Sequence, residues 1–217
     1  MSHITLVRHG QANSSARTEG GYDRLSPLGR QQAEWLGAHL RDSQQHHARL
    51  YCGTLRRHQE TAAALKLELD CIEDPRLNEL QYFNMAKALE AQQGIPVPVD
   101  VKDFVTHFPQ LIQAWMEDRI EGAPERFADF EARTREVLEE IGRGEGPALV
   151  VTSGGFIAMT MRLHLQLEIP AMANLSLSIM NSSLHRLFPV GGTWSPVLFN
   201  AVPHLEHPDR HHAQTHV

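Results

Sequence analysis

The chain has 217 residues, of which 41% are hydrophobic and 21% are charged, and its formal net charge is −6. This composition excludes a fibrous or disordered chain, and the negative charge disfavours sequence-independent binding to nucleic acid. The length is sufficient for a single core, so we expect one domain over residues 1–217. Any anionic ligand must then be held by a local cluster of positive charge.

The ends and the cysteines of the chain bear on where the protein acts. The start, MSHITLVRHG, has only a short apolar stretch before Arg8 and His9, so we expect neither a signal peptide nor an anchor. No run approaches the roughly 20 apolar residues of a membrane span. Cys52 and Cys71 are too few for a disulfide framework or a zinc site. We therefore predict a cytoplasmic protein without a membrane partner, with a homodimer and a monomer both left open.

The first half of the chain predicts alternating strands and helices. Residues 4–7 form a short, mostly β-branched apolar run that is typical of a buried parallel strand. Ser26 and Pro27 are suited to the first turn of a helix, in which Leu28, Trp35, Leu36 and Leu40 recur at helical spacing. A second strand is expected over 49–52, followed by a helix with Thr54 as its N-cap.

The second half continues this alternation after an interruption. Between residues 84 and 124 the pattern becomes irregular, which we interpret as an insertion over the site with one helix near 109–121. An amphipathic helix follows from Phe127 to Ile141, then a strand over 148–152 and a helix over about 156–167. Late strands are expected at 184–187 and 197–202, and the His-rich tail over 204–217 is expected to be poorly ordered. The order of elements predicts an α/β fold with a mostly parallel sheet.

Three polar segments follow predicted strands directly. They are Arg8-His9-Gly10, Arg57 just after Thr54, and Ser153-Gly154-Gly155. The carboxyl ends of strands in open α/β sheets meet at one crevice, where ligands bind. Two guanidiniums, one imidazole and a glycine-rich helix start would suit a phosphate group there.

These segments resemble the motifs of a known family. Leu6-Val7-Arg8-His9-Gly10 is similar to the signature of the histidine phosphatase superfamily, which shares the fold of cofactor-dependent phosphoglycerate mutase. Further similar segments occur in the family's order, and together they span about residues 4 to 165: Leu25-Ser26-Pro27-Leu28-Gly29, Leu55-Arg56-Arg57 with Glu60-Thr61-Ala62, Leu77-Asn78-Glu79 and Val150-Val151-Thr152-Ser153-Gly154-Gly155. The resemblance implies a three-layer α/β/α fold.

The resemblance also implies roles for named residues. His9 would attack phosphorus and form a phosphohistidine that water later hydrolyses. Arg8 and Arg57 would bind the phosphoryl oxygens, and Glu79 would protonate the leaving alkoxide. Gly10 would allow close backbone approach to the phosphate, and Gly154 would offer a helix N-terminal amide. The mechanism requires neither a metal nor a cofactor, and the tail histidines lack Cys or carboxylate partners at ligand spacing.

Ser153 departs from the family pattern, which normally has a second histidine at this position. A hydroxyl can donate one hydrogen bond to a phosphoryl oxygen but carries no charge, so weakened catalysis is expected. His107 and His185 are candidates to supply the missing imidazole, and alternatively the helix N-terminus could suffice together with Ser153. Ser153 could also serve only as an N-cap.

The sequence favours a phosphatase acting on phosphate monoesters of small molecules, bound as substrate or as inorganic phosphate. The alternative from another class is a phosphate-binding pseudoenzyme or regulatory phospho-ligand binder, which the serine at position 153 motivates. A phosphoglycerate mutase is disfavoured because the insertion offers only Lys87, Lys102 and Arg119 among acidic neighbours.

Overall fold

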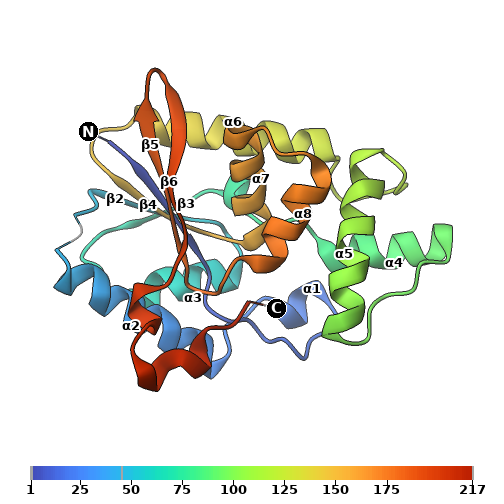
Figure 1. Cartoon of the computed structure of the whole chain (residues 1–217), viewed down its shortest axis with the longest axis horizontal. Helices are drawn as coiled ribbons and strands as arrows, with labels where there is room; N and C mark the ends of the chain where they lie inside the picture. Colours follow the sequence, from blue (N-terminus) through green and yellow to red (C-terminus); the bar gives the residue numbers. More distant parts are fainter. Residues whose placement is uncertain (1, 45, 217) are drawn as a thin grey trace.

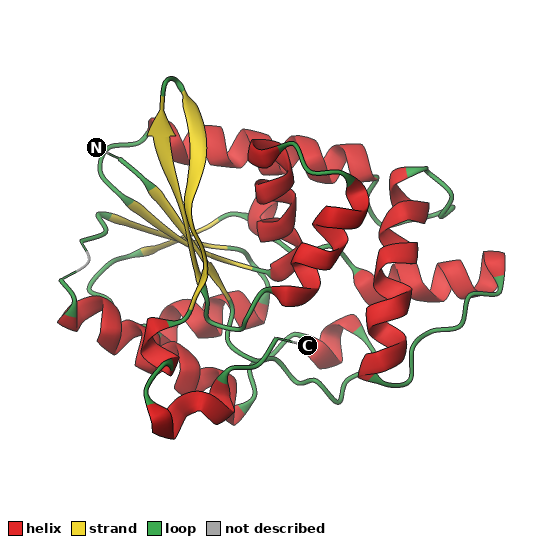
Figure 2. Cartoon of the chain, in the orientation of Figure 1, coloured by secondary structure: helices red, strands yellow, loops and turns green. Residues whose placement is uncertain are grey.

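A six-stranded mixed sheet forms the centre of the molecule, as the computed structural model shows for residues 2–44 and 46–216 (Figures 1 and 2). The strands are β1 (Ile4–Arg8), β2 (Arg49–Cys52), β3 (Cys71–Glu73), β4 (Ala148–Thr152), β5 (Leu184–Val190) and β6 (Thr193–Ala201), in the order β3-β2-β4-β1-β5-β6. The first four strands run parallel, and β5 and β6 add an antiparallel edge. The predicted α/β class with a mostly parallel sheet is confirmed.

Helices cover both faces of the sheet. They are α1 (Glu19–Tyr22), α2 (Pro27–Asp42), α3 (Arg56–Ala64), α4 (Tyr82–Gln93), α5 (Val101–Met116), α6 (Phe127–Arg143), α7 (Gly154–Leu165) and α8 (Ile169–Ser178). Successive strand residues point to opposite faces, so Leu6 and Val150 pack in the core with α6 and α7. Val7 and Val151 pack in the second core with α2 and α3. The fold has three layers, as the resemblance implied.

The segment 84–124 contains more helix than the sequence predicted. Helix α4 was not predicted, and α5 begins at Val101 instead of near Pro109. The Asp100 side chain accepts a hydrogen bond from the Asp103 amide and caps α5, so the proline lies inside the helix. Proline favours the first turn of a helix, which misled the sequence-based boundary. Figure 1 shows α4 and α5 beside the sheet, at the end where its strands meet the candidate site described below.

The tail differs from the prediction of poor order. Two short 3₁₀ segments, Pro203–Leu205 and Pro208–Ala213, lie against α2, and Leu205 and Ala213 are fully buried. Gln32 Nε2 donates to the Ala213 carbonyl at 2.7 Å, and the Asn181 amide donates to the Thr215 carbonyl at 2.8 Å. These two hydrogen bonds fix the backbone of a segment whose composition alone suggested disorder.

The short strand β3 was also not predicted, because its three residues are all exposed and show no alternation. It adds to β2 in parallel and brings the Cys71 Sγ to 3.0 Å from the Cys52 Sγ. Cys52 is buried at 1% exposure, as expected for a small apolar side chain, and both cysteines are free.

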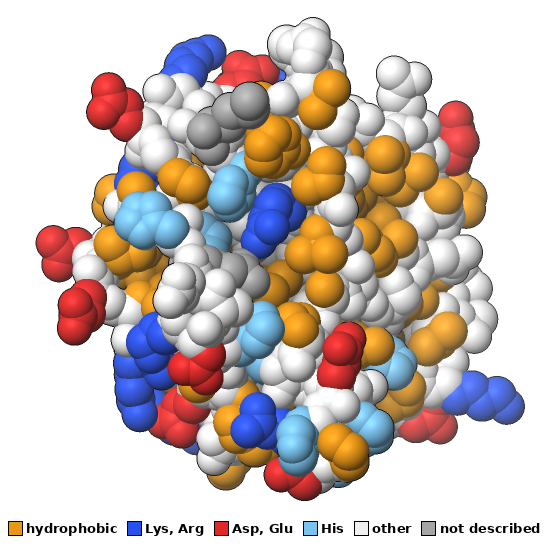
Figure 3. Space-filling view, turned by 60° about the vertical axis from the view of Figure 1, so that its left-hand side comes forward, with side chains coloured by type: hydrophobic (Ala, Val, Ile, Leu, Met, Phe, Trp, Pro, Cys, Tyr) orange, Lys and Arg blue, Asp and Glu red, His pale blue; other side chains and the backbone are white. Residues whose placement is uncertain are grey.

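No helix in the described part of the chain is both long enough and apolar enough to cross a membrane. On the face drawn in Figure 3, basic and acidic side chains are interspersed among hydrophobic and histidine side chains. This face therefore presents no continuous basic surface.

Buried neutral histidines predict that acid destabilises the fold. Burial is the largest cause that lowers the pKa of His47 to about 4, and that of His185 and His204 to about 3. Below the unfolded value of about 6.5, the unfolded chain takes up protons that the folded chain does not. Above about pH 6.5 these histidines are neutral in both the folded and the unfolded chain, so the two states bind the same number of protons. The free energy of unfolding should therefore fall by about 1.4 kcal/mol per histidine for each pH unit below about 6.5, until the pH reaches the pKa of that histidine in the folded chain.

Urea unfolding at about pH 7 and about pH 5.5 measures this loss, which should reach several kcal/mol for the three residues together. His204→Gln should make the pH dependence shallower, whereas His212→Gln, at an exposed position, should leave it unchanged. Equal unfolding free energies at the two pH values would contradict the assignment of these histidines as neutral.

Candidate active site

The candidate site lies where β1 and β4 end side by side. Arg8 pairs with Thr152 in the parallel register, and the His9 amide donates to the Thr152 carbonyl at 2.9 Å. His9 and Ser153 directly follow the ends of these two strands and are therefore neighbours. Helix α3 follows the adjacent strand β2, so the side chains of its first turn reach the same place.

His9 is held in one tautomer. Its Nδ1 lies 2.7 Å from the Gly10 carbonyl, which can only accept, so Nδ1 carries the proton. Its Nε2 accepts a hydrogen bond from Arg57 Nε at 3.3 Å, so Nε2 presents a lone pair. His9 is 2% exposed. Burial lowers the pKa of His9 well below its usual range, and the nearby Arg57, Arg8 and His58 lower it further. These contacts favour the neutral form of the His9 imidazole, with its lone pair on Nε2.

Arg57 lies at the beginning of α3 and is the arginine of the Arg56-Arg57 pair that enters the site. Its side chain is buried, whereas the exposed Arg56 pairs with Glu60. The Asp23 carboxylate accepts hydrogen bonds from the Arg56 and Arg57 amides and also forms an ion pair with Arg57 Nη1 at 3.0 Å. Asp23 thus occupies the N-terminus of α3. The predicted N-cap, Thr54, instead accepts a hydrogen bond from the Asn78 side chain.

Arg8 approaches the site from the end of β1. Its Nη1 donates to the Ile179 carbonyl and, at 2.7 Å, to the His216 carbonyl. Its Nε is buried and has no hydrogen-bond partner among the described residues. Burial is the main cause that lowers the pKa of the Arg8 guanidinium, which Arg57 lowers further. An anion bound beside Arg8 would relieve this unfavourable environment.

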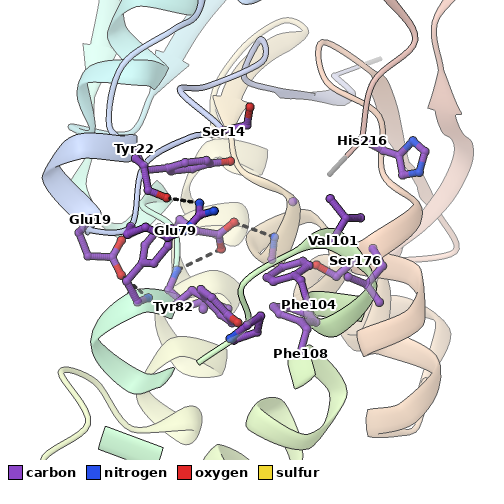
Figure 4. A pocket seen from close by; sticks show the side chains of 18 of the residues that line it. Ser14, Glu19, Tyr22, Glu79, Tyr82, Val101, Phe104, Phe108, Ser176 and His216 are labelled. Carbon is purple, nitrogen blue, oxygen red and sulfur yellow. Dashed lines mark hydrogen bonds between the residues drawn. The ribbon is translucent and has the colours of Figure 1, made fainter. Parts of the chain in front are cut away.

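Glu79 reaches the site from the segment after the 3₁₀ turn Pro75–Leu77. Its Oε2 accepts a hydrogen bond from the Gly155 amide at 2.9 Å and its Oε1 from the Leu80 amide at 3.0 Å. Figure 4 shows this carboxylate at the wall of the pocket, between Tyr22 and Tyr82. The carboxylate therefore has a fixed position at the N-terminus of α7.

Gly10 packs directly against the backbone of α2. Its amide donates to Thr61 Oγ1 at 3.1 Å, so this N–H is already bonded. A Cβ at Gly10 would lie 2.2 Å from the Gly29 carbonyl oxygen. Gly10 therefore permits a close backbone approach to α2.

Ser153 occupies the N-cap position of α7, but its side chain makes no capping hydrogen bond. Its Oγ lies 2.6 Å from Nε2 of His58, a residue that the sequence analysis did not select. His107 and His185 lie elsewhere. His107 Nδ1 contacts the Tyr82 hydroxyl at 3.0 Å, and His185 Nε2 contacts Ser183 Oγ at 2.8 Å. Neither lines the pocket at the site.

A pocket of about 360 Å³ opens above these residues (Figure 4). Its polar end is lined by Arg8, Arg57, Glu79, Gly154 and Gly155. Its opposite wall is mostly aromatic and aliphatic, and is formed by Tyr82, Phe83, Phe104, Phe108 and the segment 97–101. His9 lies beneath the pocket and does not line it, and its Nε2 is bonded to Arg57 Nε. Lys87, Lys102 and Arg119 are not among the lining residues.

Glu19 is a further carboxylate at the pocket that the sequence analysis missed. It accepts hydrogen bonds from the Phe83 and Asn84 amides, at the beginning of α4. Burial raises the pKa of Glu19. Glu19 lies in α1, so these hydrogen bonds join α1 to α4, and both helices line the pocket. The spacing of residues in the sequence does not predict this contact.

Comparisons with known proteins identify the family and the fold of the chain. Residues 4–202 match the family model described as histidine phosphatase superfamily (branch 1). No curated protein sequence has significant similarity to the chain.

Among solved structures, the chain is similar to the mycobacterial glucosyl-3-phosphoglycerate phosphatase in complex with VO3, with 25% identity, a TM-score of 0.66, and 93% of this chain and 100% of that chain covered. A phosphoglycerate mutase from Bacillus anthracis has 21% identity and a TM-score of 0.69, with 94% of each chain covered. A mutant phosphoserine phosphatase from Entamoeba histolytica, in complex with phosphoserine, has 16% identity and a TM-score of 0.68, with 94% of this chain and 100% of that chain covered. The latter two show a shared fold. The chain therefore belongs to branch 1 of the histidine phosphatase superfamily.

Proposed function

We propose that this chain is a phosphatase that hydrolyses phosphate monoesters of small molecules through a phosphohistidine at His9. The observation that carries the proposal is the Nε2 lone pair of a neutral His9 beside Arg57, with the Nδ1 proton held by Gly10. Histidine in this state is a nucleophile, and guanidiniums are the groups that best match phosphoryl oxygens. The similarity to a phosphatase whose structure contains VO3 supports the same reaction class.

The proposed reaction has two steps. In the first, His9 Nε2 forms a bond to phosphorus while the bond to the ester oxygen breaks, and Glu79 gives that oxygen a proton. In the second, water attacks phosphorus, Glu79 takes a proton from it, and the bonding pair returns to Nε2. Arg8 and Arg57 stabilise the charge on the phosphoryl oxygens in both steps. Before the first step, the bound phosphate displaces the hydrogen bond between Arg57 Nε and His9 Nε2.

The wall opposite the phosphate end suggests an apolar ester group. The ring centroids of Tyr82 and Phe104 lie 5.0 Å apart, and those of Phe104 and Phe108 lie 5.5 Å apart. The three rings therefore form a continuous aromatic surface. Figure 4 shows Tyr82, Phe104 and Phe108 together on one side of the pocket. We propose that this surface binds the organic part of the substrate.

Hexyl phosphate should be a better substrate than ethyl phosphate, because the two leaving groups are almost equally basic but only hexanol is long enough to contact this wall. With about 0.8 kcal/mol for each fully buried methylene, a partly buried chain should raise kcat/KM by about 10-fold or more. Steady-state phosphate release for both esters gives the ratio.

Phe104→Ala should reduce the preference for the longer ester. Val105→Ala removes a neighbouring side chain of α5 that does not line the pocket, so it should leave the preference intact. A kcat/KM that is the same for both esters in the wild type would exclude an apolar ester subsite, while His9-dependent turnover would still stand.

A further inference from the structure

We infer that His58 is the second histidine of this site, and that it acts through Ser153 by orienting the serine hydroxyl toward the phosphoryl group on His9. This inference rests on the proposed phosphatase function. His58 lies on α3 and Ser153 at the end of β4, so two different elements would build one donor. Ser153 is the residue that would touch the substrate, and His58 is a positioning residue.

The two side chains and His9 form a compact triangle. The His58 Nε2 to Ser153 Oγ distance is 2.6 Å, and the His9 and His58 ring centroids lie 5.7 Å apart. The parallel register between β1 and β4 places His9 and Ser153 side by side on one face of the sheet. Both His58 and Ser153 are fully buried. A short hydrogen bond in such an environment is stronger than one exposed to water.

The direction of this hydrogen bond follows from its surroundings. His58 Nδ1 is buried and has no hydrogen-bond partner among the described residues. A buried N–H without a partner is rarer than an acceptor without one, so the proton belongs on Nε2, which donates to Ser153 Oγ. Ser153 Oγ accepts no hydrogen bond from a helix amide. Ser153 then keeps its own hydroxyl hydrogen, which has no acceptor in the described part of the chain. That hydrogen is available to a phosphoryl oxygen.

Gly53 provides the space for the imidazole. A Cβ at this position would lie 2.3 Å from His58 Nδ1 and 2.6 Å from Asn78 Oδ1, both closer than real contacts allow. The backbone of Gly53 is not left-handed, so its conformation does not require glycine. The absence of a side chain at this position instead leaves room for the His58 ring. Burial lowers the pKa of His58 well below its usual range, with a further contribution from Arg57. A neutral imidazole is consistent with a donor role beside two guanidiniums.

This arrangement explains how the site can work with a serine where the sequence resemblance places a histidine. An imidazole at position 153 would occupy the space that His58 fills, because Ser153 Oγ is already in contact with Nε2. The single substitution Ser153→His should therefore lower turnover. If the serine merely weakened the site, Ser153→His should instead raise turnover.

Exchange of the two residues is the direct test. Ser153→Ala should lower kcat for p-nitrophenyl phosphate by about 10²-fold, the typical effect of one lost donor to a developing charge. His58→Ala should lower kcat by about 10-fold or more with little change in KM, and the double variant His58→Ala/Ser153→Ala should be no slower than Ser153→Ala. The exchange variant His58→Ala/Ser153→His should recover activity relative to His58→Ala, because it places an imidazole at 153 with room beside it.

Two further variants separate this role from mere support of the fold. His58→Gln retains an N–H near the position of Nε2 and should keep more activity than His58→Ala. Gly53→Ala retains the His58 imidazole but should displace its ring, because the new methyl group would clash with it. This variant should therefore lower kcat as His58→Ala does. Far-ultraviolet circular dichroism checks folding of each variant. A His58→Ala variant that folds and turns over as fast as the wild type would overturn the inference while His9-dependent hydrolysis remains. Loss of the proposed function would appear separately, as turnover that survives His9→Ala.

Discussion

His9→Ala should lower kcat for p-nitrophenyl phosphate by about 10⁴-fold or more, the scale seen when a covalent nucleophile is removed. The substitution removes the imidazole nitrogen that accepts from Arg57 Nε and leaves the surrounding backbone hydrogen bonds in place. The two arginines remain, so the variant should still bind inorganic phosphate. Steady-state rates and phosphate titration by calorimetry measure the two properties separately.

His212→Ala is the matched control, because it removes an exposed imidazole from the tail. It should turn over at the wild-type rate. If His9→Ala retains more than about a tenth of the wild-type kcat, His9 is not the nucleophile. Phosphate binding without turnover in the wild type itself would instead identify the chain as a phosphate-binding pseudoenzyme.

Glu79→Gln should have an effect that depends on the leaving group. For hexyl phosphate, which needs a proton on the departing alkoxide, kcat should fall by about 10² to 10⁴-fold. For p-nitrophenyl phosphate, the phenolate leaves without a proton, so phosphorylation of His9 should continue while attack by water slows. The variant should then release nitrophenol in a burst, followed by a slow steady state.

The glutamine can still accept a hydrogen bond from the Gly155 amide, so the turn between β4 and α7 should keep its structure. Glu136→Gln, on the exposed side of α6, is a control for loss of a carboxylate and should not change either rate. Equal losses of kcat for both esters, without a burst, would indicate that Glu79 acts on binding and not on proton transfer.

The long elements of this fold could be predicted because their sequence patterns coincide with their packing. Residues 4–7 and 148–152 read as buried strands, and both lie in the centre of the sheet. The stripe from Phe127 to Ile141 read as an amphipathic helix, and α6 spans Phe127–Arg143. Polar residues after these strands could be placed at one edge because parallel strands end together.

The remaining elements depend on contacts that spacing does not reveal. The hairpin of β5 and β6 turns at Gly191 and Gly192, both with positive φ, so the strands extend further toward the turn than the predicted 184–187 and 197–202. The tail is ordered by distant partners such as Gln32. His58 was overlooked because an imidazole beside an arginine on a helix has no pattern of its own. Only the fold brings it against Ser153.

Trapping of the phosphorylated enzyme tests the central claim most directly. Wild-type protein and Glu79→Gln are mixed with a radiolabelled aryl phosphate, quenched within the first turnover, digested under alkaline conditions and mapped by mass spectrometry. We predict label on the peptide that contains His9, stable to alkali and lost in acid, with more of it in Glu79→Gln than in the wild type. Turnover with no label on His9 in either protein would contradict the account.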